Sequence, residues 1–317
     1  MKRGLVLIFW LAGCVAPSLH TQSGSITFAL IGDTPYSGFE AYALDSMIAE
    51  LNREDLAFVI HVGDITAGNG PCTDAWFEAR KRQFQEINHP FVIVPGDNDW
   101  VDCHRSGLEP LERLDKFREL FESGDESLGQ RTLRLERQSG DPRHGTQFGE
   151  YREHMRWIAG SVLFVGLNVQ GSNNNLGRTA QMDAEYRQRM AAVFAWLDDS
   201  AKLARQRNLA GMVIFAQANP DFEGRFRRRS GGADGFLEFR NALLALALDF
   251  KKPILFIHGD THDHRVDHPL ADPATGEPMR NFSRVIVFGS PQTRWVRATI
   301  DAEDPLLFRA APADLFR

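Results

Sequence analysis

The sequence lacks the glycine-rich and serine motifs that mark several large enzyme classes. It has no Gly-x-x-x-x-Gly-Lys-Ser/Thr phosphate loop, and no Gly-x-Gly-x-x-Gly segment follows an apolar run of strand length. It also has no Gly-x-Ser-x-Gly segment, the turn that carries the nucleophile of many serine hydrolases. These absences argue against a P-loop nucleoside triphosphatase, a dinucleotide-dependent enzyme and a serine hydrolase of that type.

An excess of basic residues is also missing. Lysine and arginine number 36 against 42 aspartate and glutamate residues, so the formal net charge is −6. We therefore expect no nucleic-acid partner. The one dense basic run, "RFRRRS" at 225–230, is typical of a solvated loop, with a phosphate-facing loop as the alternative. The 317 residues are enough for a full hydrophobic core, and we expect a monomer.

No apolar run near the N-terminus is long enough for a stable transmembrane helix. Lys2 and Arg3 precede the short stretch "GLVLIFWLAG", which is typical of a secretory signal, here residues 1–13. The segment "LAGC" at 11–14 resembles a bacterial lipobox, in which Cys14 would be lipidated and followed by a tether up to residue 24. An ordinary signal with an incidental cysteine is the alternative. The lipoprotein reading implies the bacterial cell envelope and a membrane partner through the lipid. Val15, rather than Asp, favours the outer membrane facing the periplasm.

Cysteine is scarce, with three residues in the whole chain. If Cys14 carries lipid, Cys72 and Cys103 remain, and in an oxidising envelope such a pair is most simply a disulfide. Each lies a few residues beyond a Gly-Asp pair, so the bridge would join two loops at one sheet edge. Two free thiols are the alternative. The absence of Cys-x-x-Cys spacing disfavours a thiolate metal site.

Apolar runs of strand length alternate with amphipathic segments in the early part of the chain. Such alternation favours parallel strands joined by right-handed crossovers. After about residue 280 the strands follow one another directly, which predicts antiparallel pairing. We predict a mixed α/β architecture in one catalytic domain over 25–317, in which the polar stretch 122–160 is an insertion. Strands are predicted at 25–31, 58–62, 91–94, 161–167, 212–217, 254–258, 284–288, 293–299 and 306–310, and helices at 38–54, 73–87, 109–121, 183–208 and 235–250.

Four predicted strands end in Gly-Asp, and this is the most informative pattern in the sequence. In open α/β sheets, ligands bind beyond the carboxyl ends of the strands. Four carboxylates at one edge would repel one another unless they take up protons or bind cations. Each Asp could instead cap a helix or a turn. The repetition favours divalent metal ligation, and the four residues are Asp33, Asp64, Asp97 and Asp260.

The last of these pairs opens a histidine-rich segment, "HGDTHDHRVDH" at 258–268. On an extended segment, alternation would place Asp260, His262 and His264 on one face. Imidazole suits Mn, Fe and Zn, whereas carboxylate suits harder ions. The alternative is a group of solvated loop histidines. Their position directly after a strand favours ligation.

In these motifs the sequence resembles the calcineurin-like metallophosphoesterases, the class that includes the purple acid phosphatases. The family's ordered strand-end motifs correspond to "GDTPY", "GDITAGN", "GDNDW", "FAQANPD" and "GDTH", over roughly residues 32–264. The resemblance implies a four-layer α-β-β-α sandwich with two mixed β-sheets and a site for two divalent metal ions between their loops. Asp33, Asp64 and His262 match family ligands directly.

The sequence departs from the family at several motif positions. Pro35 stands where the family has a ligand histidine. Asp97, Gln217 and Asp260 replace other ligands, yet all three can coordinate through oxygen. One ion would be held by Asp33, Asp64 and His262. The other would be held by an all-oxygen set of Asp64, Asp97, Gln217 and Asp260. Such a set favours Mn, Fe, Mg or Ca over Zn. The alternative is a degraded site in a catalytically inactive binding protein.

The resemblance also implies a reaction, the hydrolysis of phosphomonoesters or phosphodiesters. Asp64 would bridge the two cations, and a water activated between them would attack phosphorus in line. Asn98 stands where the family has the histidine that assists the leaving group, and an amide cannot transfer that proton. His264 is our candidate substitute. Asn173, Asn174 and Arg178 in "GSNNNLGRT" at 171–179 could bind phosphate or substrate hydroxyls, although a polar turn explains the whole segment at least as well. The substrate would be a small phosphate ester or an envelope-derived one.

The adjacent acids of "DND" at 97–99 invite one further comparison. Haloacid-dehalogenase phosphatases carry a pair of aspartates, but after their first strand. Here the first strand is followed by "DTP". That family is therefore disfavoured.

Overall fold

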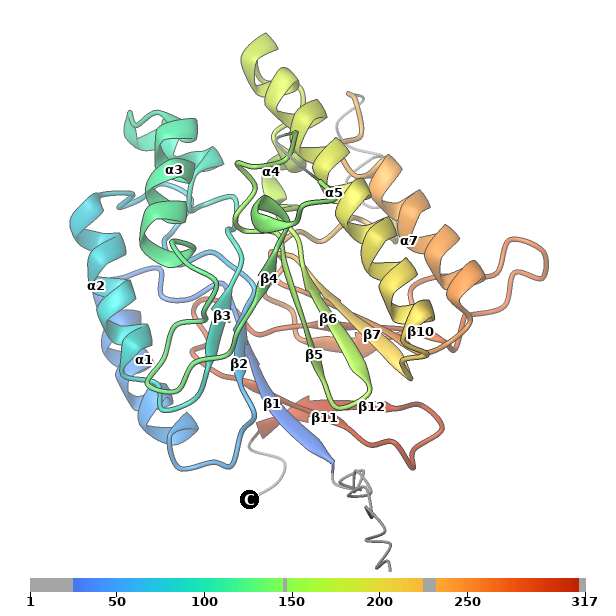
Figure 1. Cartoon of the computed structure of the whole chain (residues 1–317). Coiled ribbons are helices and arrows are strands. Elements are labelled where there is room, and N and C mark those ends of the chain that lie inside the picture. The colour runs from blue at the N-terminus through green and yellow to red at the C-terminus, as the bar shows by residue number, and fades with distance from the viewer. Residues whose placement is uncertain (1–24, 145–146, 225–231, 314–317) are drawn as a thin grey trace, which may run out of the picture.

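The protein forms a sandwich of two β-sheets with helices on both outer faces. The structure, a computed structural model, describes residues 25–144, 147–224 and 232–313. Figure 1 shows α1, α2 and α3 outside one sheet and α5 and α7 outside the other. The predicted four-layer α-β-β-α architecture with two mixed sheets is confirmed.

The first sheet has five strands in the order β12-β11-β1-β2-β3. Strands β1 (Ile26–Ile31), β2 (Val59–His61) and β3 (Phe91–Ile93) are parallel, whereas β11 (Val296–Ile300) and β12 (Phe308–Pro312) are antiparallel to their neighbours. The carboxyl ends of the three parallel strands therefore meet at one edge of the sheet.

The second sheet has seven strands in the order β4-β5-β6-β7-β8-β10-β9. Its four central strands are parallel, and antiparallel strands flank them on both sides. The loops that follow β7 and β8 therefore leave this sheet at one edge. The strands are β4 (Glu136–Arg137), β5 (Met155–Ala159), β6 (Val162–Gly166), β7 (Gly211–Phe215), β8 (Ile254–His258), β9 (Arg265–Asp267) and β10 (Phe282–Ile286).

Helices α1, α2, α3 and α5 begin where the sequence supplies a capping side chain. The Ser37 hydroxyl accepts the N–H of Glu40 at 3.2 Å, and the Thr179 hydroxyl caps the long helix α5 in the same way. Such caps satisfy backbone donors that have no partner within the helix. The helices are α1 (Gly38–Leu51), α2 (Asp74–Gln85), α3 (Pro110–Phe121), α4 (Gly171–Asn174), α5 (Ala180–Gln206) and α7 (Leu237–Phe250), with short 3₁₀ helices at Val101–Ser106 and Gln138–Gly140.

Alternation along the strands divides the core into three layers. In β1, Phe28 and Leu30 pack between the sheets, whereas Ala29 and Ile31 pack against α1. A third cluster joins β6, β7 and β8 to α5 and α7, with Trp196 fully buried in it. This period of two is what a strand with helices on one face and a second sheet on the other requires.

Two features of the second sheet were not expected from the sequence. Strand β10 pairs parallel with β8 and antiparallel with β9, whereas β11 and β12 pair antiparallel in the first sheet. The predicted insertion 122–160 contributes β4 and β5 to the second sheet, and β5 pairs with β6 along its full length. The strand β5 was missed because Arg156 and Trp157 break the apolar run. Arg156 is fully buried because carboxylates surround it.

No helix in the described parts of the chain has the length and apolarity needed to cross a membrane. Residues 1–24, which contain the predicted signal, Cys14 and the tether, lie outside the described residues, as does the basic run 225–230.

Candidate active site

The four predicted strand-end aspartates converge where the two sheets meet. Asp33, Asp64 and Asp97 follow the parallel strands of the first sheet, and Asp260 follows β8 of the second. The N–H of Asp260 donates to both carboxylate oxygens of Asp33, at 2.9 and 3.1 Å, which links the sheets. The carboxylate of Asp97 lies close enough to those of Asp33, Asp64 and Asp260 for their negative charges to repel one another. Residues far apart in the sequence therefore form one acidic site.

The glycine before an aspartate leaves room for a neighbouring carboxylate. A Cβ on Gly96 would lie 2.0 Å from Oδ1 of Asp64, and one on Gly259 would lie 2.0 Å from Oδ2 of Asp33. No side chain fits at either distance. Two of the four Gly-Asp pairs are thus explained by the packing of one acidic loop against another, whereas Gly32 and Gly63 leave room for the Val62 side chain and the backbone of Gly96.

Several site residues have a left-handed backbone conformation. The φ angles are 49° at Asp33, 61° at Asp64, 70° at Asp260 and 58° at His262. A non-glycine residue in this region costs about 1–2 kcal/mol. Strain of this kind is characteristic of functional sites, where the fold holds side chains in a required geometry.

Burial makes these carboxylates costly to ionise. Asp33 and Asp64 are almost inaccessible, and in the described residues no lysine or arginine pairs with Asp33, Asp64, Asp97 or Asp260. Burial first, and then repulsion between the carboxylates, raises the pKa of Asp33 and Asp64 well above the usual range. The same two causes raise the pKa of Asp97 to about 8. The site therefore needs protons or cations to be stable at neutral pH.

His262 and Tyr36 complete one side of the site. The His262 Nδ1 lies 2.8 Å from the carbonyl oxygen of Ser290, which can only accept, so Nδ1 carries a hydrogen. In the neutral ring Nε2 then presents a lone pair, 3.6 Å from Oδ1 of Asp33. The Tyr36 hydroxyl lies 2.9 Å from Oδ2 of Asp64 and 3.1 Å from this Nε2. Sequence analysis missed Tyr36, although it follows directly after the non-ligating Pro35.

The Gln217 amide is oriented differently from the prediction. Its oxygen accepts the N–H of Gly171 at 2.6 Å, and its nitrogen donates to Oδ2 of Asp64 at 3.1 Å. The backbone donor fixes this orientation, because turning the amide would place its NH₂ against the N–H of Gly171. Gln217 thus serves as a hydrogen-bond donor that positions Asp64, and the predicted ligation through its oxygen is not the arrangement that the structure shows.

Asp99 fixes the loops that carry Asp64 and Asp97. Its carboxylate accepts the N–H groups of Asp64, Ile65 and Gly96 at 2.8–2.9 Å. Burial raises the pKa of Asp99, but these hydrogen bonds hold the increase to a value of about 6. Sequence analysis did not assign Asp99, although it stands at the acidic position of the family's third motif.

Asn98 lies at the same turn as Asp99. Its N–H donates to Oδ1 of Asp64 at 3.0 Å. Within the described residues its side-chain amide makes no hydrogen bond, although the residue is largely buried. The amide is therefore available to a ligand.

A second missed acid, Asp102, extends the site beyond Asp97. The Ser172 hydroxyl donates to Oδ1 of Asp102 at 2.9 Å, and Arg105 Nη1 lies 2.8 Å from Oδ2. A Cβ on Gly171 would lie within 2.8 Å of both Asp97 and Asp260, so the turn α4 packs directly on the acidic site. Ser172 in this turn has φ and ψ of 47°, which is left-handed. Nothing in the local sequence signals this conformation.

The predicted substrate-binding asparagines have structural partners. The Asn174 amide is fully buried and bonds to Arg189 and to the carbonyl of Gly235. Asn173 is exposed, but its amide ties α4 to residues 233–235. These contacts favour the polar-turn alternative for both residues.

Two other predicted residues lie near the edge of the site. Arg178 is half-buried, and its Nη1 donates to the Val101 carbonyl at 2.8 Å. His264 contacts the Ile286 carbonyl through Nδ1 at 2.7 Å and stacks on Phe288 with ring centres 4.5 Å apart. Their roles stay predictions.

Cys72 and Cys103 form a disulfide, as expected from the sequence. Both sulfur atoms lie within 3.5 Å of the Asn98 carbonyl oxygen. The bridge therefore ties the loop after β2 to the loop after β3, close to Asp64 and Asp97.

The donor set fits divalent cations. The Tyr36 oxygen, Oδ2 of Asp64 and Nε2 of His262 converge, and with Asp64 ionised and the ring and phenol neutral these three atoms share a single hydrogen. Four buried carboxylates, which have no lysine or arginine partner within the described residues, adjoin them. Bound cations would satisfy both conditions, since they accept lone pairs and balance the charge.

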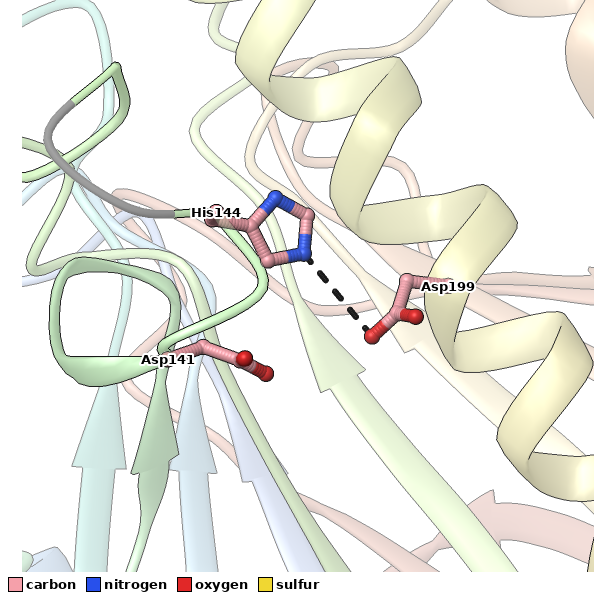
Figure 2. A group of neighbouring side chains, drawn as sticks. All are labelled: Asp141, His144 and Asp199. Atoms are coloured by element: carbon pink, nitrogen blue, oxygen red, sulfur yellow. Dashed lines mark ion pairs between the residues drawn. The ribbon is translucent and has the colours of Figure 1, made fainter.

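A separate Asp-His-Asp group lies between the 3₁₀ segment at 138–140 and α5. Figure 2 shows Asp141, His144 and Asp199, with His144 Nε2 3.8 Å from Oδ2 of Asp199. Arg156 pairs with Asp141 at 3.3 Å and with Asp199 at 2.9 Å, and Arg143 also pairs with both. Because two guanidinium groups already neutralise these carboxylates, the group is adequately explained as a structural ion-pair cluster.

Fold and site together define a metallohydrolase built on an α-β-β-α sandwich. The family model described as calcineurin-like phosphoesterase matches residues 26–264. The chain belongs to this family and is accordingly a phosphoric ester hydrolase, with a dimetal site implied by the family. Among curated proteins none matches the chain in sequence.

Solved structures share the fold at low sequence identity. A dimetal phosphatase from Danio rerio superposes with a TM-score of 0.57, at 13% identity, over 90% of this chain and 98% of its own. PhoD superposes with a TM-score of 0.51, also at 13% identity, over 87% of this chain and 63% of its own. At these identities the likeness establishes the fold alone.

Proposed function

We propose that the chain hydrolyses phosphate monoesters or diesters with two divalent cations, and that an N-terminal lipid anchors it in the bacterial envelope. The observation that carries the catalytic part is the convergence of four buried aspartates, which no lysine or arginine in the described part of the chain neutralises, near the lone pairs of His262 and Tyr36. Family membership supports the same reaction class.

The donor types indicate which residues would hold the metals. Asp33, Asp64 and His262, together with Tyr36, would hold one ion, and Asp64, Asp97 and Asp260 the other. The predominance of oxygen favours Mn, Fe, Mg or Ca over Zn. When bound, such ions acidify a coordinated water and balance the charge that develops on phosphorus oxygens.

Other groups of the protein orient the proposed ligands and the substrate. The Asn98 N–H and the Gln217 amide hold the two oxygens of Asp64 in place. The unpartnered side-chain amide of Asn98 can donate a hydrogen bond to the substrate but cannot protonate a leaving oxygen. His264 stays our candidate for that proton, although burial lowers its pKa, so that a smaller fraction of the ring carries the proton at neutral pH. Substrates with acidic leaving groups are therefore favoured.

The test is hydrolysis of p-nitrophenyl phosphate and bis-p-nitrophenyl phosphate after loading with Mn, Mg, Ca, Fe or Zn in turn. We expect turnover with at least one of the oxygen-preferring ions, and loss of turnover in Asp64→Asn. Asp115→Asn, an exposed change on α3, is the matched control. Absence of turnover with every ion in a folded protein would favour a binding protein that has lost catalysis.

Envelope anchoring rests on the sequence of the first residues alone. Metabolic labelling with a fatty-acid probe should mark the wild-type chain in a bacterial host, and Cys14→Ser should abolish the label. Labelling that survives this change would reject the lipoprotein proposal without affecting the catalytic one.

A further inference from the structure

We propose that Arg105 and Arg178 form an anion subsite beside the metal site, and that the preferred substrates are phosphoanhydrides, whose leaving group is itself a phosphate. This inference rests on the proposed phosphoesterase function and names its substrate class. It depends on the position of the two guanidinium groups relative to Asn98, the residue at the leaving-group side.

Arg105 lies beside the free amide of Asn98. Arg105 Nη1 and Asn98 Oδ1 lie 2.9 and 3.0 Å, respectively, from the point that a Cβ on Gly68 would occupy. Gly68 has no side chain, so the space between these groups is not filled from that position. The Arg105 side chain is 50% exposed, and within the described residues its contacts go through Nη1, to Asp102 and to the Gly68 carbonyl at 3.2 Å, so Nε and Nη2 can donate to a ligand.

Arg178 reaches the same region from the loop after α4. Its Nη1 donates to the Val101 carbonyl, one residue before Asp102. Arg178 and Arg105 both interact electrostatically with Asp102, and they lie near enough to repel each other. Two guanidinium groups thus lie near Asp102, which itself neighbours Asp97 and Asp260, and they are the cationic groups at this edge of an otherwise acidic site within the described residues.

The chemistry of the leaving group connects this charge to Asn98. An alkoxide must be protonated as it departs, and an amide cannot supply the proton. A phosphate is stable as an anion and needs no proton. In the proposed step the water oxygen bonds to the transferred phosphorus as the phosphorus–oxygen bond of the anhydride breaks. The electron pair stays on the departing phosphate, and the protons of the water pass to the product phosphates or to solvent.

Arginine is suited to this task because its planar fork binds two phosphate oxygens at once. A charge-assisted hydrogen bond contributes about 1.5–3 kcal/mol, so loss of one arginine should cost about tenfold or more in binding of the departing phosphate. A substrate whose leaving group is uncharged would not use the subsite.

The experiment compares two substrates with the manganese-loaded full chain, pyrophosphate and p-nitrophenyl phosphate. Their leaving groups are of similar acidity but differ in charge. We expect the ratio of kcat/KM for pyrophosphate to that for p-nitrophenyl phosphate to fall about tenfold or more in Arg105→Gln and in Arg178→Gln. Arg105→Lys should restore part of the ratio. The control Arg82→Gln, an exposed change on α2, should leave the ratio unchanged.

A uniform loss on both substrates would show that the arginines only hold Asp102 in place, and an unchanged ratio would show that they do not contact the substrate. Either outcome overturns the proposal.

If the wild-type protein hydrolyses neither substrate, the proposed function fails, and calorimetry still tests the subsite. Methylenebisphosphonate should then bind about tenfold more weakly to the two glutamine variants than to the wild-type chain. Methylphosphonate should bind with equal affinity to the wild-type chain and both variants. Equal methylenebisphosphonate affinity in the wild-type chain and the two variants would reject the anion subsite.

Discussion

The hydroxyl oxygen of Tyr36 lies 2.9 Å from Oδ2 of Asp64. The same hydroxyl oxygen of Tyr36 lies 3.1 Å from Nε2 of His262. Pro35 cannot supply the ligand that the family has at this motif. The next residue provides an oxygen in contact with two predicted ligands instead. Tyr36 is therefore in a position to contribute to the proposed ligand set where the family has a histidine.

The first prediction concerns this oxygen. Tyr36→Phe should weaken binding of the first cation by about tenfold or more, in the range seen when groups that support a metal site are removed. The ring is retained, so folding should be unaffected. Metal content after dialysis, measured by inductively coupled plasma mass spectrometry, checks this. The exposed Tyr42→Phe is the control. Equal metal content in both variants would show that Tyr36 plays no part in ligation.

The second prediction concerns Asp99, which touches no substrate but accepts three backbone N–H groups from the loops of Asp64 and Gly96. Asp99→Asn replaces one accepting oxygen by a donor, which opposes at least one of these N–H groups. We expect metal affinity to fall by about 10–100-fold, as is typical for outer partners of metal ligands. Calorimetric titration with Mn²⁺ measures it. Unchanged affinity would mean that the loops keep their positions without Asp99.

The third prediction is a pH dependence of metal stabilisation. Folding raises the pKa of Asp33, Asp64 and Asp97, the last to about 8, whereas in the unfolded chain such groups titrate near pH 4. The metal-free fold therefore holds protons that the unfolded chain releases, so these groups make it less stable as pH rises from about 4 to about 8. Cations replace these protons.

The increase in melting temperature on adding saturating Mn²⁺ should accordingly be larger at pH 8 than at pH 5. Thermal denaturation followed by circular dichroism, with a chelator as the reference state, makes the comparison. An increase that is equal at both pH values, or larger at pH 5, would contradict the account of the buried carboxylates.

The fourth prediction concerns the disulfide. Cys72 and Cys103 are 31 residues apart, and a closed loop of that size contributes about 3–4 kcal/mol through the unfolded chain. The double change Cys72→Ser with Cys103→Ser should lower the free energy of unfolding by about this amount, measured by urea denaturation. Because the bridge joins the two loops at Asn98, metal affinity should fall as well. A loss of stability with full metal affinity would limit the bridge to a global role.

Much of the fold could be predicted from the sequence because its signals are local and repeated. The apolar runs that end in Gly-Asp gave β1, β2, β3 and β8, and with them the edge at which the aspartates meet. Strand β5 was missed, since the fully buried Arg156 reads as a surface residue until its carboxylate partners are known. Burial of a charge depends on partners from distant segments, which no local pattern reveals.

Within the site, residue type was easier to predict than orientation. The aspartates could be proposed from their position after strands. The Gln217 amide could not be oriented, because its direction depends on the N–H of Gly171, which belongs to a left-handed turn 46 residues earlier. Tyr36 was missed for a similar reason, since its contact with His262 spans 226 residues.

The most direct test of the central claim is the number of cations bound per chain. Calorimetry with Mn²⁺ on the chelator-treated protein, with metal analysis after dialysis, should give two sites in the wild-type chain. Asp64→Asn should lose both or retain one weak site, because both proposed ligand sets share Asp64. Failure of the wild-type chain to bind Mn²⁺, Mg²⁺, Ca²⁺ or Fe²⁺ would contradict the claim that cations hold the buried aspartates together.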